Sequence, residues 1–167
     1  MKAPTSPQKT DRRRTLVQIG AALLVSSGLV QAADSAVRTN GRPLVQLHIT
    51  TKGDLLEFST QALSCKADSR VRLTFVNGAR YVDFDHNWVL IRSGTFDAFV
   101  AAATQAGAEH GWMPAQHPGM IAATAMAHKG QTVSVEFNAP QVGRYLYICS
   151  MPGHSASMWG VFTVTAA

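Results

Sequence analysis

Apolar and polar residues alternate along several short segments of this chain, which is the pattern of half-buried β-strands. Three segments alternate cleanly, 44–51, 70–77 and 132–138, and the residues predicted to face inward are Val45, Leu47, Ile49, Val71, Leu73, Phe75, Val133, Val135 and Phe137. The segment 86–92 (HNWVLIR) is apolar enough to predict a central strand. Further strands are predicted at 55–59, 143–149 and 159–165.

One segment has helical periodicity instead. Residues 95–107 (TFDAFVAAATQAG) place apolar side chains at i, i+3, i+4 and i+7, with Thr95 as a candidate N-cap and Gly107 as the end. Residues 111–127 show no clear period and predict a structured excursion. Seven to eight short strands with one inserted helix predict an all-β fold, specifically a β-sandwich.

The composition indicates a packed domain that follows an N-terminal export signal. The chain is 46% apolar and only 15% charged, which argues against disorder. Residues 1–32 combine a basic start (DRRRT), the uncharged apolar run 16–30 and small residues near Ala32, as in an export signal peptide. Arg12 and Arg13 favour the twin-arginine route. Residues 33–167 then form a single domain, and a periplasmic location is expected.

The excess of positive charge lies mostly in that N-terminal segment. Residues 1–32 hold five basic residues and one acidic residue, a net charge of +4, whereas the remaining 10 basic and 9 acidic residues give +1. The domain therefore has no basic face for nucleic acid. The apolar run of 15 residues is short for a membrane span, so contact with a membrane is expected only if this segment is retained.

The chain has two cysteines, Cys65 and Cys149, 84 residues apart. In an exported protein a disulfide between them is the simplest interpretation. Metal binding by Cys149 is the alternative, because a sulfur in a disulfide is not a thiolate ligand.

The loop YICSMPGHSASM favours metal binding. It holds Cys149, His154 and Met158 between the last two predicted strands, and Pro152-Gly153 predicts a tight turn that returns the His154 ring to the Cys149 sulfur. His86, at the start of a predicted central strand, offers one further ligand. Two imidazoles, a thiolate and a thioether match the type 1 blue-copper arrangement, whereas zinc has little use for a thioether.

These motifs resemble those of the cupredoxin family, in particular its azurin and auracyanin group. The similarity covers about residues 44–164 and includes HNWVL, LEFSTQAL, MIAATAM, SVEF and the Cys-x4-His-x3-Met spacing. The resemblance implies a Greek-key β-sandwich that binds one copper ion through His86, Cys149, His154 and the axial Met158.

The resemblance also implies roles around the metal. His86 would be the buried ligand and His154 the ligand near the surface, while Asn87 would tie the ligand strand to the Cys149 loop. Asp85 stands where azurin has a glycine whose carbonyl faces the metal. Cys65 would be a lone thiol, because Ser69 stands where one of the azurin disulfide cysteines would be.

The function that the resemblance implies is periplasmic electron transfer by Cu(I)/Cu(II) cycling, with redox partners such as cytochromes or a membrane or periplasmic oxidoreductase. A copper carrier or storage protein is the alternative. An enzyme is not expected, because Ile148 and Ser150 flank Cys149 where copper oxidases and nitrite reductases of this fold place histidine.

The other histidines and Trp88 have simpler interpretations. His48 alternates to the polar face of its strand, and Trp88 is expected in the core. A second, weaker copper site is an open alternative in the excursion, which contains His110, His117, His128, Met113, Met120 and Met126.

Overall fold

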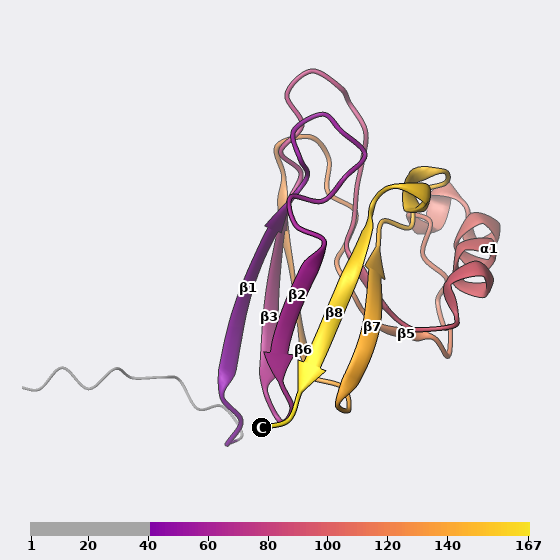
Figure 1. Ribbon diagram of the computed structural model, residues 1–167. Helices are drawn as coiled ribbons and strands as arrows, with labels where there is room; N and C mark the ends of the chain where they lie inside the picture. Colours follow the sequence, from indigo (N-terminus) through magenta and orange to yellow (C-terminus); the bar gives the residue numbers. More distant parts are fainter. Residues whose placement is uncertain (1–40) are drawn as a thin grey trace, which may run out of the picture. The chain divides into compact units, whose positions relative to one another are not determined.

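The computed structural model describes residues 41–167, and these residues build two β-sheets that face each other (Figure 1). The predicted export segment 1–32 lies outside the described residues. Eight strands and one α-helix fall within them, so the predicted all-β sandwich is confirmed. In residues 41–167 no helix is both long and apolar enough to cross a membrane.

The first sheet has three strands in the order β1-β3-β6. They are β1 (Leu44–Thr50), β3 (Arg70–Val76) and β6 (Thr132–Asn138). β1 pairs with β3 in parallel, and β3 pairs with β6 antiparallel. The predicted inward residues of β3, Val71, Leu73 and Phe75, are fully buried, while His48 on β1 is exposed. The alternation of the sequence thus places the inner face of this sheet correctly.

The second sheet has five strands in the order β2-β8-β7-β4-β5. They are β2 (Ala62–Lys66), β8 (Trp159–Thr165), β7 (Gly143–Ile148), β4 (Val89–Arg92) and β5 (Met120–Ala123). β2 pairs with β8 in parallel, and the other pairs are antiparallel. Because β7 and β8 are hydrogen-bonded neighbours, the loop between them has both of its ends fixed in one sheet.

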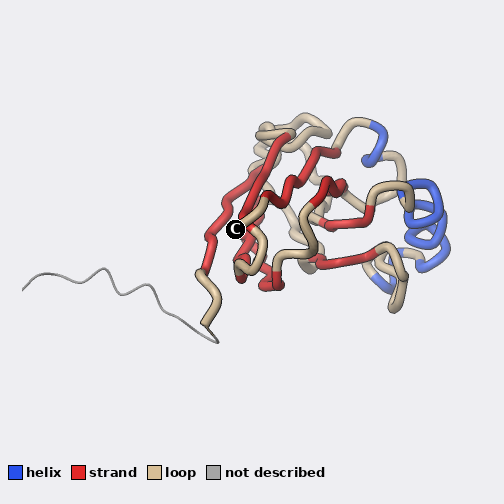
Figure 2. The backbone as a smooth tube through the Cα atoms, turned by 60° about the horizontal axis from the view of Figure 1, so that its bottom comes forward, coloured by secondary structure: helices blue, strands red, loops and turns tan. Residues whose placement is uncertain are grey.

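The first three residues of β4, Val89, Leu90 and Ile91, are apolar and buried because both faces of the strand are covered there. Leu90 packs into the core between the sheets, with Trp88, Tyr147 and Phe162. Val89 and Ile91 face the other way, against α1 (Phe96–Ala106). The helical segments gather on this one side of the strands (Figure 2). Burying each large side chain contributes roughly 2 kcal/mol, which anchors β4 and the segment that leads into it.

Several predicted boundaries are wrong. Residues 55–59 form a loop with one isolated bridge, Thr51 to Phe58, and the strand follows at Ala62–Lys66. β5 lies inside the stretch predicted as an irregular excursion. Both strands are short and acquire their structure by pairing with β8 and β4, which are distant in sequence. Local alternation is therefore weak in them.

The predicted helix is present, with one difference at its start. Gly107 ends α1 at φ 75°, a left-handed value that glycine tolerates. Thr95 occupies the N-cap position but makes no capping bond, because its hydroxyl donates to the carbonyl of Arg92 at 2.8 Å. The side chain thus stabilises the turn between β4 and α1.

Candidate metal centre

The loop between β7 and β8 carries three of the four predicted ligands. Cys149 follows the last residue of β7, one residue outside the strand expected to contain it, and Met158 directly precedes the first residue of β8. The backbone still pairs across this point: the Cys149 N–H donates to the Met158 carbonyl at 3.0 Å. The sheet therefore fixes both ends of the loop.

Within the loop, a tight turn brings His154 back toward Cys149, as the sequence predicts. Gly153 has φ 80°, and the His154 N–H donates to the Met151 carbonyl at 3.0 Å. A single 3₁₀ turn, His154–Ala156, follows. The Met158 N–H donates to the His154 carbonyl at 2.8 Å, so this turn also sets the position of Met158.

His86 comes from the other side of the site and lies three residues before β4, not within it as expected. It forms an isolated antiparallel bridge with Ala127, through two hydrogen bonds of 3.1 Å and 2.7 Å. The fully buried Asn77 side chain donates to the carbonyls of Ala127 and Phe84, at 3.0 Å and 2.8 Å. These bonds hold the backbone on both sides of His86.

Three donor atoms converge in the interior. Cys149 Sγ lies 3.8 Å from His86 Nδ1 and 3.7 Å from His154 Nδ1, and the two nitrogens are 3.2 Å apart. Exposure is 1% for His86, 0% for Cys149 and 6% for His154. Among residues 41–167, this is the one group of His, Cys, Asp or Glu side chains that could hold a metal ion.

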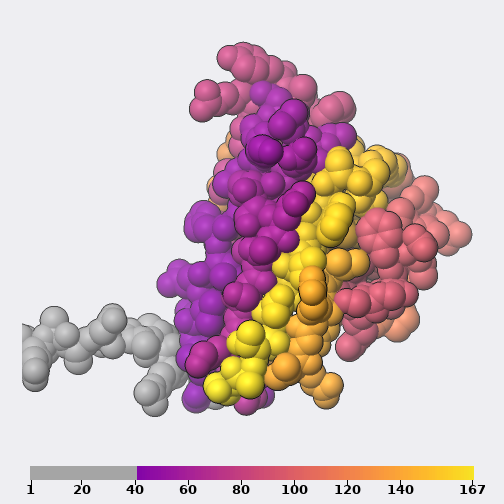
Figure 3. All heavy atoms as spheres, viewed as in Figure 1, coloured from indigo at the N-terminus to yellow at the C-terminus, as the bar shows by residue number. Residues whose placement is uncertain are grey.

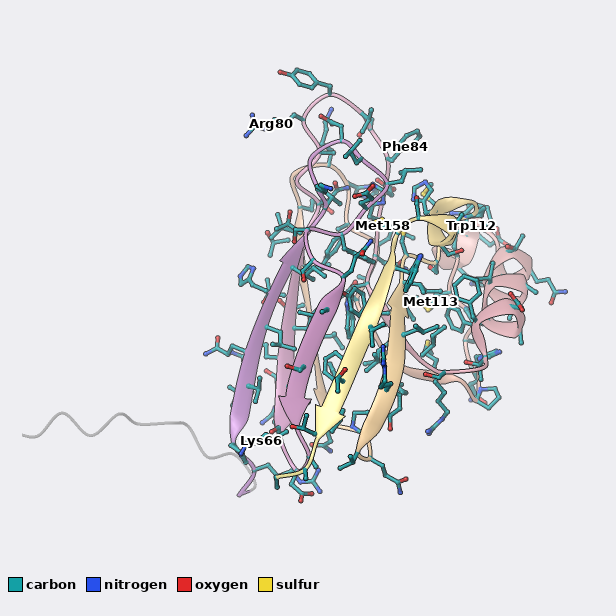
Figure 4. All side chains as sticks on the ribbon, in the orientation of Figure 1. Lys66, Arg80, Phe84, Trp112, Met113 and Met158 are labelled. Carbon is teal, nitrogen blue, oxygen red and sulfur yellow. The ribbon has the colours of Figure 1, made fainter. Side chains whose placement is uncertain are left out.

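Met158 is fully buried in the core cluster that also contains Cys149. Figure 4 shows Met158 near the end of β8, at the same end of the sheets as Phe84 and opposite Lys66. The structure thus brings the fourth predicted ligand to this end, tied by backbone bonds to both Cys149 and His154.

Asn87 links the two parts of the site, as predicted. Its side-chain NH₂ donates to Ser150 Oγ at 2.7 Å, and its oxygen accepts the Ser150 N–H at 2.9 Å. Both residues are buried, so water does not compete for these bonds. Because Asn87 follows His86 and Ser150 follows Cys149, the pair fixes the spacing between two of the donors.

Burial controls the protonation of the donors. It lowers the pKa of His86 to about 4, with a further lowering from the charge of His154 and an opposing effect of Asp85. Burial also lowers the pKa of His154. Both rings are therefore neutral near pH 7 and have a lone pair for a metal.

The thiol behaves in the opposite way. Burial raises the pKa of Cys149 to about 11, while the backbone N–H groups of Asn87 and Met151 act to lower it. A metal ion must therefore displace the proton of the thiol when it binds. The same two N–H groups are in place to stabilise the thiolate once it forms.

Two residues just before His86 shape the surroundings of the site. Asp85 accepts a hydrogen bond from the His128 ring at 2.7 Å, so its carboxylate is engaged away from the donors. Phe84 lies edge-on to the His154 ring, with centroids 5.7 Å apart, and His154 is less exposed than a surface ligand would be. The contact of Phe84 with His154 was not predicted, although an aromatic residue two positions before His86 is visible in the sequence.

Alternative interpretations of the cysteines and the other histidines are also resolved. Both cysteines are free, so the disulfide between Cys65 and Cys149 is wrong and Cys65 is a lone, buried thiol. Trp88 is fully buried, as expected of a core residue. In the described part of the chain, no group of His, Cys, Asp or Glu side chains that could hold a metal includes His110, His117 or His128.

The chemistry of the donors fits copper. Two neutral imidazoles and a thiol that can ionise form an N₂S set, with a thioether in the same loop, and soft sulfur ligands of this kind favour copper. No carboxylate joins the group in residues 41–167, whereas zinc sites often include one.

Comparison with known proteins agrees with this chemistry. The family of copper binding proteins described as plastocyanin/azurin matches residues 45–165. Auracyanin-A of Chloroflexus aurantiacus is 35% identical over 127 residues, which are 75% of this chain and 77% of the relative. Auracyanin-B of the same organism is 40% identical over 75% of this chain, but the match spans only 54% of its own length.

The solved structure of auracyanin A, a "blue" copper protein, superimposes with a TM-score of 0.68 at 35% identity. The match covers 73% of this chain and 99% of that structure. The similarity in sequence and the similarity in fold thus extend over nearly equal shares of the chain.

Proposed function

This chain belongs to the plastocyanin/azurin family of copper-binding proteins, and we propose on that basis that it is an exported electron-transfer protein with one type 1 copper site. The observation that carries this proposal is the convergence of His86 Nδ1, Cys149 Sγ and His154 Nδ1 within 3.8 Å of one another. In this proposal the three atoms are the strong ligands, and the thioether of Met158 is the weak axial one.

When bound, copper supplies one-electron chemistry by alternating between Cu(I) and Cu(II). The contribution of the protein is to keep the ligands in one arrangement for both states. The Asn87–Ser150 pair, the bridge between His86 and Ala127, and the backbone bond from Cys149 to Met158 all act in this way. Since these contacts belong to the sheet framework, the ligand atoms need to move little when the charge changes.

Electrons are proposed to enter and leave on the His154 side. Met151 is half-buried and Pro152 is exposed beside it, which gives a small, partly apolar surface. Small interfaces of this kind suit brief encounters between redox proteins. The proposed partners are cytochromes or a membrane or periplasmic oxidoreductase. The proposed location is the periplasm, to which the N-terminal segment would direct the protein for export.

The competing function is copper delivery or storage. A delivery protein releases copper to an acceptor, so its ligands need to be accessible. Here all four proposed ligands are buried, and the most exposed of them, His154, is 6% exposed. This burial favours a retained metal that exchanges electrons.

Reduction in the presence of a strong Cu(I) chelator distinguishes the two functions. The copper-loaded protein is cycled by voltammetry with excess bathocuproine disulfonate, and its reduced form is mixed with an oxidised c-type cytochrome. We expect a reversible one-electron wave, copper retained through repeated cycles, and cytochrome reduction. Transfer of copper to the chelator on the first reduction, without electron exchange, would instead establish the delivery function.

A further inference from the structure

A single carboxylate holds the loop between β3 and β4 from outside that loop. Asp54 Oδ1 accepts three consecutive backbone N–H groups, from Arg80 and Tyr81 at 2.8 Å and from Val82 at 3.1 Å. The hydrogen bonds from Tyr81 and Val82 lower the pKa of Asp54, so it is ionised near pH 7. Bonds from N–H groups to a carboxylate are stronger than bonds between neutral groups.

The loop needs such support because residues 77–85 contain no helix or strand. Its start is fixed by Asn77, and the Gly78 N–H donates to Thr51 Oγ1 at 2.9 Å. Its tip projects beyond the neighbouring surface (Figure 3), and Tyr81 there is 88% exposed. Among the hydrogen bonds of residues 41–167, those to Asp54 are the ones that anchor this tip.

The same loop ends at the metal centre. Phe84 lies edge-on to the His154 ring at a centroid distance of 5.7 Å and an interplanar angle of 73°. Phe84 is 45% exposed, whereas His154 is only 6% exposed. The partly exposed Phe84 ring therefore covers part of the buried His154 ring, and its position depends on the loop that carries it.

The segment that contains Asp54 is itself tied to the ligand loop. Ser157, next to Met158, donates from its hydroxyl to the Leu56 carbonyl at 2.8 Å. Asp54 thus belongs to a segment fixed against one side of the metal centre, and it holds a loop that covers another side. A change at Asp54 affects the cover without touching any ligand.

We propose that Asp54 is a positioning residue, which holds the 77–85 loop so that Phe84 shields His154 and limits the access of water and small molecules to the metal centre. This proposal rests on the proposed function only for its effect on copper. The shielding favours Cu(I), because the oxidised site carries one more positive charge and a drier environment disfavours that charge.

The test compares Asp54→Ala with Asp54→Asn and Glu57→Ala. Asparagine retains an oxygen that can accept the three N–H groups, so Asp54→Asn should recover most of the wild-type behaviour. Glu57 lies in the same segment, and replacing it by alanine removes the same negative charge. The Glu57 carboxylate forms an ion pair with Lys52 at 3.0 Å and makes no hydrogen bond or ion pair with the 77–85 loop. Glu57→Ala is therefore the matched control for charge.

Two measurements use the metal-free protein. In Asp54→Ala, amide hydrogen exchange at Arg80, Tyr81 and Val82 should become roughly tenfold faster or more, and the ring protons of His154 should lose the chemical-shift displacement caused by Phe84. Phe84→Ala should change the His154 shifts and leave the exchange of those amides as it is. Unchanged amide exchange or unchanged His154 shifts in Asp54→Ala would overturn the proposal, whether or not copper binds.

Two further measurements use the copper-loaded protein. Asp54→Ala and Phe84→Ala should both lower the reduction potential and raise the rate of oxidation by ferricyanide roughly threefold or more, while Glu57→Ala should do neither. If the loop loosens but potential and rate stay at wild-type values, Asp54 is only structural and the proposal is wrong. If wild type takes up no copper, the proposed function fails, and the metal-free measurements still decide the role of Asp54.

Discussion

At the scale of single residues, burial determines which donor atoms are ready for a metal. His86 and His154 are neutral because burial lowers the pKa of each ring, whereas the same burial keeps the proton on Cys149. In the metal-free site, the two imidazole rings therefore each have a lone pair available, and the Cys149 thiol has a proton to lose. Copper uptake should release that proton.

The low pKa of His86 predicts how the stability of the metal-free protein depends on pH. The folded-state pKa is about 4 and the ordinary value is 6.5, so between these values the unfolded chain binds a proton that the folded chain does not. The free energy of unfolding should therefore fall by roughly 2 kcal/mol as pH drops from 6.5 to 4.

Urea unfolding of the metal-free protein across this range measures the effect. His86→Gln should remove most of that pH dependence, and His48→Gln, which changes an exposed ring on β1, should retain it. Equal pH profiles for wild type and His86→Gln would show that the ring is not held neutral.

Met158→Leu tests the weakest of the proposed ligands. Leucine fills a similar volume in the core but has no lone pair, and the thioether stabilises Cu(II) more than Cu(I). The blue colour should remain, and the reduction potential should rise by roughly 60 mV, equivalent to a tenfold weaker preference for Cu(II). A lower potential on voltammetry would argue against Met158 as the axial ligand.

At the scale of elements, the β7–β8 pair supports the ligand loop without help from the metal. Six residue pairs join the two strands, from Gly143 opposite Val164 to Ile148 opposite Trp159. The backbone bond between Cys149 and Met158 continues this pairing into the site. The gap left by a missing ligand should therefore stay open.

His154→Gly makes use of that gap. The variant should lose the blue band and regain it when imidazole is added, since the added ring restores the missing nitrogen ligand. Electron exchange with a cytochrome should recover less, because the surface around position 154 has changed. A variant as blue as wild type without imidazole would reject His154 as a ligand.

Gly160 on β8 shows how closely the sheet is packed beneath this loop. It lies opposite Tyr147, and a Cβ at this position would come within 2.2 Å of the Tyr147 ring. The ring is fixed by a 2.8 Å hydrogen bond from its hydroxyl to the Thr60 carbonyl. Gly160→Ala should lower the free energy of unfolding by about 2 kcal/mol or more, measured by urea unfolding.

Gly53→Ala separates this clash from backbone strain. Gly53 has φ 62° and no atom within 4 Å of the added Cβ, so the change should cost about 1 kcal/mol from backbone conformation alone. If both variants lose the same stability, the Tyr147 ring moves aside and the packing argument is wrong.

The elements also show where sequence patterns succeed. β1, β3 and β6 alternate over seven residues each, which is long enough to separate an inner face from an outer one. β2 and β5 have only five and four residues and are defined by distant partners. Such strands are set by pairing in the folded chain, which single-sequence alternation does not report.

At the scale of the whole molecule, the proposed ligands could be picked out from the sequence more readily than their surroundings. Cys149, His154 and Met158 share one loop, and the HNWVL motif points to His86, so residue type and spacing were enough to propose these four residues. Two contacts join loops that are distant in sequence. The Phe84 ring packs on His154, and Asp54 accepts hydrogen bonds from the backbone of residues 80–82. No periodicity marks such contacts, and only the folded structure reveals them.

The described part of the molecule has two hydrophobic cores, and the candidate metal centre adjoins one of them. The donors lie at one end of the core between the two sheets, while a second core packs α1 against the outer face of β4 and β7. The backbone hydrogen bonds that place the proposed ligands, from Cys149 to Met158 and between His86 and Ala127, need no metal ion. The fold should therefore form without copper, and copper should bind to a site that is already assembled.

The visible absorption spectrum of the copper-loaded protein tests the central claim most directly. A thiolate bound to Cu(II) in this ligand set should produce an intense blue band by charge transfer from Cys149. Cys149→Ser should be colourless, and Cys65→Ser, which removes the other buried thiol, should be as blue as wild type. A Cu(II)-loaded wild type without a strong visible band, or a blue Cys149→Ser, would contradict the account.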